Sequence, residues 1–129
     1  MPEEHPNPRG ELSLRTVGMP AETNPAGYIF GGWIMSLMDL AAGVAASSQA
    51  NGRVVTAAVS NLSFLRPVKV GDVVCVYTEV SRIGRTSITL GVEIWVLRRG
   101  QGERVRVTAA EFVLVAVDDS GRPRELPAS

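Results

Sequence analysis

The period of the hydrophobic positions changes once along the chain and divides it into a helical part and a strand part. From about Gly32 to Ser48 nearly every residue is apolar or small, and Asn51-Gly52 follows, a pair typical of a helix end. After Arg53 apolar and polar residues alternate with a period of two, which predicts strands. We therefore expect one long apolar helix followed by a run of strands.

Five segments carry the strand pattern, one before the helix and four after it. They are Leu12–Val17, Val54–Leu65, Val73–Ile83, Thr86–Arg98 and Glu103–Val117. Short connections favour antiparallel pairing, and a helix that is hydrophobic all round must be buried. Because the sheet is the only available cover, we predict an α+β fold in which an antiparallel sheet of about five strands curls around one central helix.

The sequence also predicts a bulge in one strand and whether several strand residues are buried or exposed. The apolar phase slips near Ser60-Asn61, which indicates a β-bulge, and the single cysteine, Cys75, is interpreted as a small buried hydrophobe. Glu93 and Glu111 are expected to face solvent or an interface. One face of the last strand is expected to hold Val105, Val107, Ala109, Val113, Val115 and Val117.

The length of 129 residues fits a single domain. The first residues, MPEEHPNPRGE, lack the basic and apolar parts of a signal peptide. We expect a flexible tail over 1–11, one domain over 12–119 and a C-terminal tail over 120–129. One cysteine permits no intrachain disulfide, and together these features fit a cytoplasmic protein.

The charge balance excludes some classes of partner. Thirteen basic and 13 acidic residues give a net charge of zero, so we expect no nucleic-acid partner. The apolar stretch contains Asp39, and an aspartate at the centre of a membrane span costs about 2.5–3.5 kcal/mol. The alanines and glycines around it would not offset that cost, so we expect no membrane span.

Asp39 is the only formally charged residue between Glu22 and Arg53. A carboxylate in apolar surroundings is costly unless it is paired or hydrogen-bonded. Asp39 could therefore pin the fold through a backbone amide or a distant arginine, or it could be catalytic.

Gly31 and Gly32 stand at the predicted start of the same helix. The free N–H groups of a helix N-terminus can form an oxyanion hole, although the same glycines would also suit a flexible junction. Asp39 lies eight residues after Gly31, roughly 12 Å along a helix axis. One reacting carbonyl cannot contact both groups of one helix, so a joint site requires two antiparallel helices in a two-fold dimer.

The only histidine, His5, lies in the predicted tail. Ser-His-Asp and Cys-His mechanisms need a positioned imidazole, and histidine-based zinc sites fail for the same reason. Acid–base chemistry would then depend on a carboxylate, and Asp39 is the best placed. We expect no metal.

The chain resembles hot-dog-fold acyl-CoA thioesterases of the broad-specificity bacterial type. The matching segments are TNPAGYIFGGWIMSLMDLAA, GRVVT, FLRPVKVGDVV, GRTS and EFVLVAVDDSGRPRELP. The resemblance implies a hot-dog fold and hydrolysis of acyl-CoA to a free acid and coenzyme A, within lipid metabolism. Coenzyme A is then part of the substrate, so no separate cofactor is expected. The family's dimers often assemble further, which implies a hexamer.

The resemblance also implies roles for individual residues. Asp39 matches a general base or nucleophile, the Gly31 amide (with Gly32) matches the oxyanion donor, and Asn24 matches an amide side chain that places water or the carbonyl. Asn24 could equally be a simple turn residue. The positions expected to contact the nucleotide are Arg66, Arg82, Arg85, Thr86 and Ser87. Each of the arginines could equally be a solvated charge at the end of a strand.

Of three further interpretations, two stay open and one is excluded. Trp33, Met35 and Met38 could line an acyl pocket or simply pack in the core. Hot-dog dehydratases use a histidine, which the predicted domain lacks. A non-catalytic acyl-CoA-binding or sensor module of the same fold remains the alternative to the enzyme.

Overall fold

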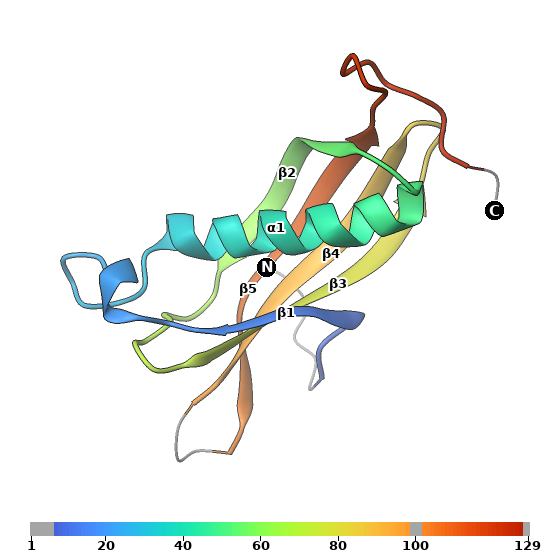
Figure 1. Cartoon of the computed structure of the whole chain (residues 1–129). Helices are drawn as coiled ribbons and strands as arrows, with labels where there is room; N and C mark the ends of the chain where they lie inside the picture. Colours follow the sequence, from blue (N-terminus) through green and yellow to red (C-terminus); the bar gives the residue numbers. More distant parts are fainter. Residues whose placement is uncertain (1–6, 99–101, 128–129) are drawn as a thin grey trace.

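A computed structural model describes residues 7–98 and 102–127 and shows one helix lying across one face of a single sheet (Figure 1). The elements are β1 (Glu11–Val17), a short 3-10 turn η1 (Pro20–Glu22), α1 (Gly31–Ala50), β2 (Val54–Phe64), β3 (Val73–Ile83), β4 (Ser87–Leu97) and β5 (Arg104–Ala116). All strand pairs are antiparallel, in the order β1-β3-β4-β5-β2. The predicted five-stranded α+β fold is confirmed.

Local sequence explains where α1 begins and ends. It begins at Gly31, one residue before the predicted start, after Phe30 in an extended conformation. It ends at Asn51, which adopts the left-handed conformation (φ 52°, ψ 47°) that asparagine tolerates better than most residues. The predicted Asn-Gly helix end is confirmed.

The core lies between one face of α1 and the inner face of the sheet. On the helix this face consists of Ile34, Met38, Ala41, Ala42, Ala46 and Ala50, all at most 2% exposed. The alanines let the helix lie close to the strands. On β4 the predicted alternation is confirmed, because Ile88, Leu90, Val92, Ile94 and Val96 are all fully buried. Each such side chain contributes about 1.5–3 kcal/mol by burial.

Two irregularities set the strand faces. The predicted bulge in β2 is confirmed: its register with β5 shifts between Ser60 and Ser63, and Asn61 has a φ of 54°. The predicted face of β5 is partly wrong, because the buried side chains beyond the middle of the strand are Phe112, Leu114 and Ala116. The register between β4 and β5 shifts beside Val107, and this extra residue reverses the alternation.

The expectation that α1 is buried on all sides is wrong for the single chain. Leu40 is 56% exposed, Val44 is 59% exposed, and Asp39 is exposed beside them. The reason is geometric, because one sheet covers only one face of a helix. An apolar stripe and the carboxylate are therefore left open along the other face.

The chain ends contact the domain where they are described. Arg9 donates its backbone N–H to Glu93 at 3.2 Å, and near the C-terminus Leu126 donates its backbone N–H to the Arg85 carbonyl at 2.9 Å. Parts of both predicted tails therefore lie against the sheet. His5 lies outside the described residues.

The outer face of the sheet, opposite α1, carries its own small cluster. Cys75, Tyr77 and Trp95 pack together there, so the predicted burial of Cys75 is confirmed. Glu93 is only 8% exposed, so the solvent-facing position, one of the two expected for it, is wrong, whereas Glu111 is exposed. The Glu93 carboxylate accepts hydrogen bonds from Trp95 Nε1 at 3.0 Å and Arg106 Nη1 at 3.1 Å.

Candidate active site

Asp39 lies on the open side of α1 and is hydrogen-bonded to a residue of the neighbouring edge strand, β2. The Thr56 hydroxyl on β2 donates a hydrogen bond of 2.5 Å to Asp39 Oδ1. Both residues are exposed in the single chain. The contact fixes the direction of the carboxylate and leaves Oδ2 available to another group.

Asp39 and Thr56 line part of an open groove of about 750 Å³ between α1 and β2. The groove is lined by Asp39, Leu40, Gly43, Val44, Ser47, Ser48, Asn51, Gly52, Arg53, Val54, Thr56 and Leu114. It therefore runs from the carboxylate along the helix to Arg53. A Cβ added to Gly43 would meet nothing within 4 Å, so the groove has free space at its middle.

The N-terminus of α1 presents unused donors. Its N-cap, Phe30, makes no side-chain capping bond, and among the described residues the first helix N–H that has an acceptor is that of Ile34, which donates to the Phe30 carbonyl at 3.4 Å. Gly31 and Gly32 are thus the positions where the positive end of the helix dipole meets solvent. A side chain at Gly31 would crowd the site, because an added Cβ would lie 3.1 Å from Phe64.

Asn24 belongs to the loop that leads into this N-terminus. Its side-chain oxygen accepts the backbone N–H groups of Ala26 at 3.0 Å and Tyr28 at 3.1 Å. The turn role considered for Asn24 is therefore real. Within the described residues the amide nitrogen of Asn24 has no hydrogen-bond acceptor, so the turn leaves its two donors available.

The structure does not bring Asp39 and Gly31 of one chain together. Both lie on α1, eight positions apart, which is about 12 Å at about 1.5 Å per residue. Thr56, which holds Asp39, comes from the half of β2 that lies away from Gly31. One chain therefore holds two incomplete halves of the predicted site.

Four of the predicted nucleotide-binding residues gather at the end of the sheet where α1 ends (Figure 1). Arg82, Arg85, Thr86 and Ser87 surround the hairpin between β3 and β4. The Thr86 carbonyl accepts the N–H of Ala116, and the adjacent Val117 donates to the Arg53 carbonyl. These bonds place the hairpin beside the Arg53 end of the groove.

Arg66 lies at the opposite end of the molecule, near the start of α1. It follows β2, and its Nη1 donates to the Arg106 carbonyl at 2.7 Å. About 30 Å of helix separates the two ends, given about 1.5 Å per residue. Within one chain Arg66 is therefore not part of the same cluster as the other four.

The C-terminal segment supports the hairpin end. Asp118 Oδ1 accepts the backbone N–H of Arg122 at 3.0 Å and both the N–H and the hydroxyl of Ser120. These hydrogen bonds, led by that from Arg122, lower the pKa of Asp118. Further along, Arg124 donates to the Ala50 carbonyl at the end of α1.

Sequence reasoning missed two groove residues, Thr56 and Arg53. Both lie in the GRVVT segment, which carried part of the family resemblance, but no local pattern gave either one a role. The Arg53 side chain is exposed, and within the described residues its guanidinium has no hydrogen bond or ion pair. The sequence left open whether Met38 lines an acyl pocket or packs in the core, and the structure buries it fully in the core.

Two absences apply to the described residues only. No helix there has the length and apolar character needed to cross a membrane. No group of three or more histidine, cysteine, aspartate or glutamate side chains is arranged there to hold a metal ion.

Comparison with known proteins decides the family. Residues 26–109 match the model of the thioesterase superfamily. The chain belongs to the thioesterase superfamily. The predicted resemblance to hot-dog acyl-CoA thioesterases is confirmed, and so is the prediction that the protein is a thioester hydrolase.

Individual relatives agree over nearly the whole chain. The acyl-CoA thioester hydrolase YciA of Salmonella typhimurium is 51% identical over 123 residues, which cover 93% of this chain and 92% of that protein. HI0827, a hexameric broad-specificity acyl-coenzyme A thioesterase solved as an aspartate-to-alanine variant, matches with a TM-score of 0.91 at 48% identity, covering 94% of this chain and 89% of the other. Cj0915 of Campylobacter jejuni, a hexameric hotdog fold thioesterase, matches with a TM-score of 0.86 at 40% identity, covering 92% and 91%.

Proposed function

We propose that the protein hydrolyses acyl-CoA thioesters to a free acid and coenzyme A, with Asp39 at the reacting centre. The observation that carries the proposal is the Asp39 carboxylate, fixed by the Thr56 hydroxyl at 2.5 Å and open to a groove of about 750 Å³. Relatives of about 50% identity are named acyl-CoA thioester hydrolases, which supports the same substrate class. The cytoplasm and lipid metabolism remain the predicted setting.

Asp39 supplies either a base or a nucleophile. As a base, it takes a proton from water while the water oxygen attacks the thioester carbonyl carbon. The C–S bond then breaks, and coenzyme A leaves as a thiolate that is protonated to the thiol. As a nucleophile, Asp39 displaces the thiolate to form a mixed anhydride, which water cleaves.

The carbonyl oxygen gains negative charge in either route and needs donors. The unused Gly31 N–H, at the positive end of α1, supplies one, with Gly32 beside it. The free amide donors of Asn24, on the loop that precedes the helix, help to place the water or the carbonyl. Neither of these groups can come from the chain that supplies Asp39, because about 12 Å of helix separates Asp39 from Gly31.

A two-fold dimer brings the halves together. β2 is an edge strand with Val55 47% and Val59 38% exposed, and the open helix face next to it exposes Leu40 and Val44. An unpaired strand edge beside an apolar stripe is a surface that a second copy can cover. With the two helices antiparallel, Asp39 of each chain faces Gly31 of the other, and two shared sites result. The hexameric relatives support further assembly into a trimer of dimers.

The groove then holds the coenzyme A arm. It leads from Asp39 along α1 to the helix end at Ala50, about 16 Å at about 1.5 Å per residue, and reaches Arg53 just beyond that end. The pantetheine arm follows it, and the phosphates meet Arg53 and the hairpin with Arg82, Arg85, Thr86 and Ser87. Antiparallel helices also bring Arg66 of the second chain toward this groove.

The experiment is a thiol-release assay over short, long and aromatic acyl-CoA substrates, with Asp39→Asn beside the wild type. We expect release by the wild type and a fall of at least about a hundredfold in Asp39→Asn, because the amide can neither accept a proton from water nor attack as a nucleophile. Coenzyme A binding by both proteins, measured by calorimetry, controls for folding. Binding without release by the wild type would instead favour the non-catalytic acyl-CoA-binding module.

A further inference from the structure

The C-terminal segment clamps the short link between α1 and β2 from both sides. Only three residues connect the two elements, and the last of them is Arg53. The Val117 N–H donates to the Arg53 carbonyl at 3.0 Å, and Arg124 Nη2 donates to the Ala50 carbonyl at 3.1 Å. In Figure 1 the C-terminal segment passes the end of α1. The segment therefore fixes both ends of the link that carries Arg53.

The Arg124 side chain closes this clamp. Its Nε donates to the Val117 carbonyl at 3.2 Å while its Nη2 binds the Ala50 carbonyl, so one planar guanidinium joins the C-terminal segment to the helix end. A cation is favoured there because the last carbonyls of a helix form the negative end of its dipole. The Arg124 N–H also donates to the Ala116 carbonyl at 2.9 Å, and Leu126 packs against the core. The backbone that carries Arg124 is thus anchored as well.

Gly52 leaves the space that the guanidinium occupies. A Cβ added to Gly52 would lie 2.5 Å from Arg124 Nη2 and 3.5 Å from its Cζ. Among the described residues beyond its chain neighbours, that Cβ would meet nothing else within 4 Å. Gly52 also lines the groove that holds Asp39. Arg124 therefore lies directly behind the groove wall, at the end where the groove reaches Arg53.

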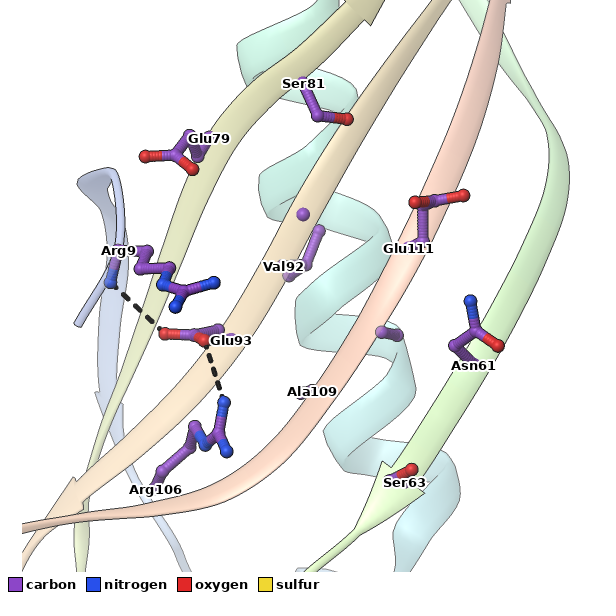
Figure 2. Close-up of a pocket in the computed structure, with 12 residues that line it drawn as sticks. Arg9, Asn61, Ser63, Glu79, Ser81, Val92, Glu93, Arg106, Ala109 and Glu111 are labelled. Atoms are coloured by element: carbon purple, nitrogen blue, oxygen red, sulfur yellow. Dashed lines mark hydrogen bonds and ion pairs between the residues drawn. The ribbon is translucent and has the colours of Figure 1, made fainter. Parts of the chain in front are cut away.

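Charge favours this end of the groove for phosphate over a basin on the opposite face of the sheet. The basin, of about 540 Å³, exposes the carboxylates of Glu79 and Glu111, and its Arg106 is already in a buried ion pair of 3.1 Å (Figure 2). In the groove, the carboxylate of Asp39 lies at the end away from Arg53. A phosphate is thus repelled at the basin and attracted at the Arg53 end of the groove.

Arg53 depends on its backbone for its direction. Its side chain is exposed, and within the described residues no hydrogen bond or ion pair holds the guanidinium. A side chain without a partner can meet a ligand reproducibly only if the backbone beneath it is fixed, because ordering it on binding costs free energy. The two hydrogen bonds of Arg124 supply that fixed backbone.

We infer that Arg124 is a positioning residue for coenzyme A recognition, which acts by holding the α1–β2 link so that Arg53 meets the phosphates. Arg124 itself does not touch the ligand. Without its two hydrogen bonds the link moves, and part of the binding free energy is spent on ordering Arg53. The inference rests on the proposed function, because that function places the phosphates at Arg53.

The experiment measures coenzyme A affinity by calorimetry, and kinetics with an acyl-CoA and the matching acyl-pantetheine, which has no phosphate. For Arg124→Ala we expect the Kd of coenzyme A and the KM of the acyl-CoA to rise about three- to tenfold, with kcat within about twofold. Kinetics with the acyl-pantetheine should not change. Arg122→Ala removes the same charge from an exposed arginine of the same segment and should behave as the wild type. Equal losses with both substrates would indicate a general structural role and overturn the inference.

Two double variants test the route of the effect. Arg53→Ala/Arg124→Ala should bind coenzyme A no more weakly than Arg53→Ala alone, because residues that act through one another are not additive. Gly52→Ala pushes the guanidinium aside, so it should weaken binding in the wild type and have no effect in the Arg124→Ala background. Additive losses in either pair would overturn the inference. Gly52→Ala keeps the arginine, so it also tests the clamp if Arg124→Ala does not fold.

Failure of the proposed function gives a different result. A wild type that binds coenzyme A but releases no thiol would contradict the proposed hydrolysis, and the affinity comparisons among the variants would still decide the role of Arg124. A wild type that does not bind coenzyme A would overturn the inference.

Discussion

The Thr56 hydroxyl on the edge strand β2 hydrogen-bonds to the Asp39 carboxylate on α1 at 2.5 Å, across 17 positions of sequence. This bond joins two open parts of the fold, the uncovered face of α1 and the edge strand β2 at one end of the sheet. The carboxylate is therefore held where the helix face and this sheet edge are both exposed.

Replacing the hydroxyl should lower turnover without removing it. In Thr56→Val the carboxylate loses the bond that orients it, and a hydrogen bond to a charged group contributes about 1.5–3 kcal/mol, or about ten- to hundredfold in rate. Thr56→Ser keeps the hydroxyl and should retain most of the activity. Steady-state assays of kcat at several pH values check this, and equal losses in both variants would point to packing rather than orientation.

The Gly31 amide can be removed without disturbing the helix. Gly31→Pro deletes only the N–H, proline is favoured at the first helical position, and Phe30 already has the extended conformation that a following proline requires. We expect kcat to fall about 10²–10³-fold, as for the loss of an oxyanion donor. Gly31→Ala adds the same Cβ near Phe64 but keeps the N–H, so it is the matched control. Equal activity in the two variants would remove the amide from the mechanism.

Arg53 should affect coenzyme A recognition and leave the chemistry unchanged. Arg53→Ala removes a cation at the far end of the groove, and we expect KM for an acyl-CoA to rise about tenfold at constant kcat. The same variant should hydrolyse an acyl-pantetheine, which has no phosphate, as well as the wild type does. Arg122→Ala, a nearby exposed arginine outside the groove, is the control. An equal KM effect on both substrates would contradict a phosphate contact.

The Asp118 turn should give a pH-dependent contribution to stability. Hydrogen bonds from Arg122 and Ser120 lower its pKa in the folded chain, so this stabilisation is present above the unfolded pKa of about 3.9 and is lost as pH falls through the folded value. We expect Asp118→Ala to have a lower Tm than the wild type at pH 7. The difference should shrink toward zero below about pH 3. A Tm difference that stays constant over this range would show that the charge is not responsible.

The sequence predicts the elements of this fold well because their periodicity is local. The alternation along β4 and the Asn51 helix end depend on neighbouring residues alone, and both are confirmed. The face of the second half of β5 could not be predicted, because the bulge at Val107 arises from pairing with β4. The exposure of Asp39 was missed for a related reason. Which side of α1 the sheet covers depends on tertiary packing, and the local pattern of residues does not contain it.

The candidate site residues show the same contrast between local and tertiary features. Asp39, Gly31 and Asn24 could be proposed from the sequence because they lie within one dense segment around the helix start. Thr56 and Arg53 were not, because only the folding of β2 against α1 brings them into the groove with Asp39. The buried Glu93–Arg106 pair was also missed, since alternation alone places Glu93 in solvent.

Mixing two inactive variants tests most directly whether the site is shared. Co-expressed in equal amounts, Asp39→Asn and Gly31→Pro chains should form mixed dimers in which one site has both native groups, because each chain supplies what the other lacks. With half the dimers mixed, and one of two sites intact in each, thiol release should recover to about a quarter of the wild-type rate. Each variant alone should stay near its own low rate. A mixture no more active than its components would contradict a site built from Asp39 of one chain and Gly31 of the other.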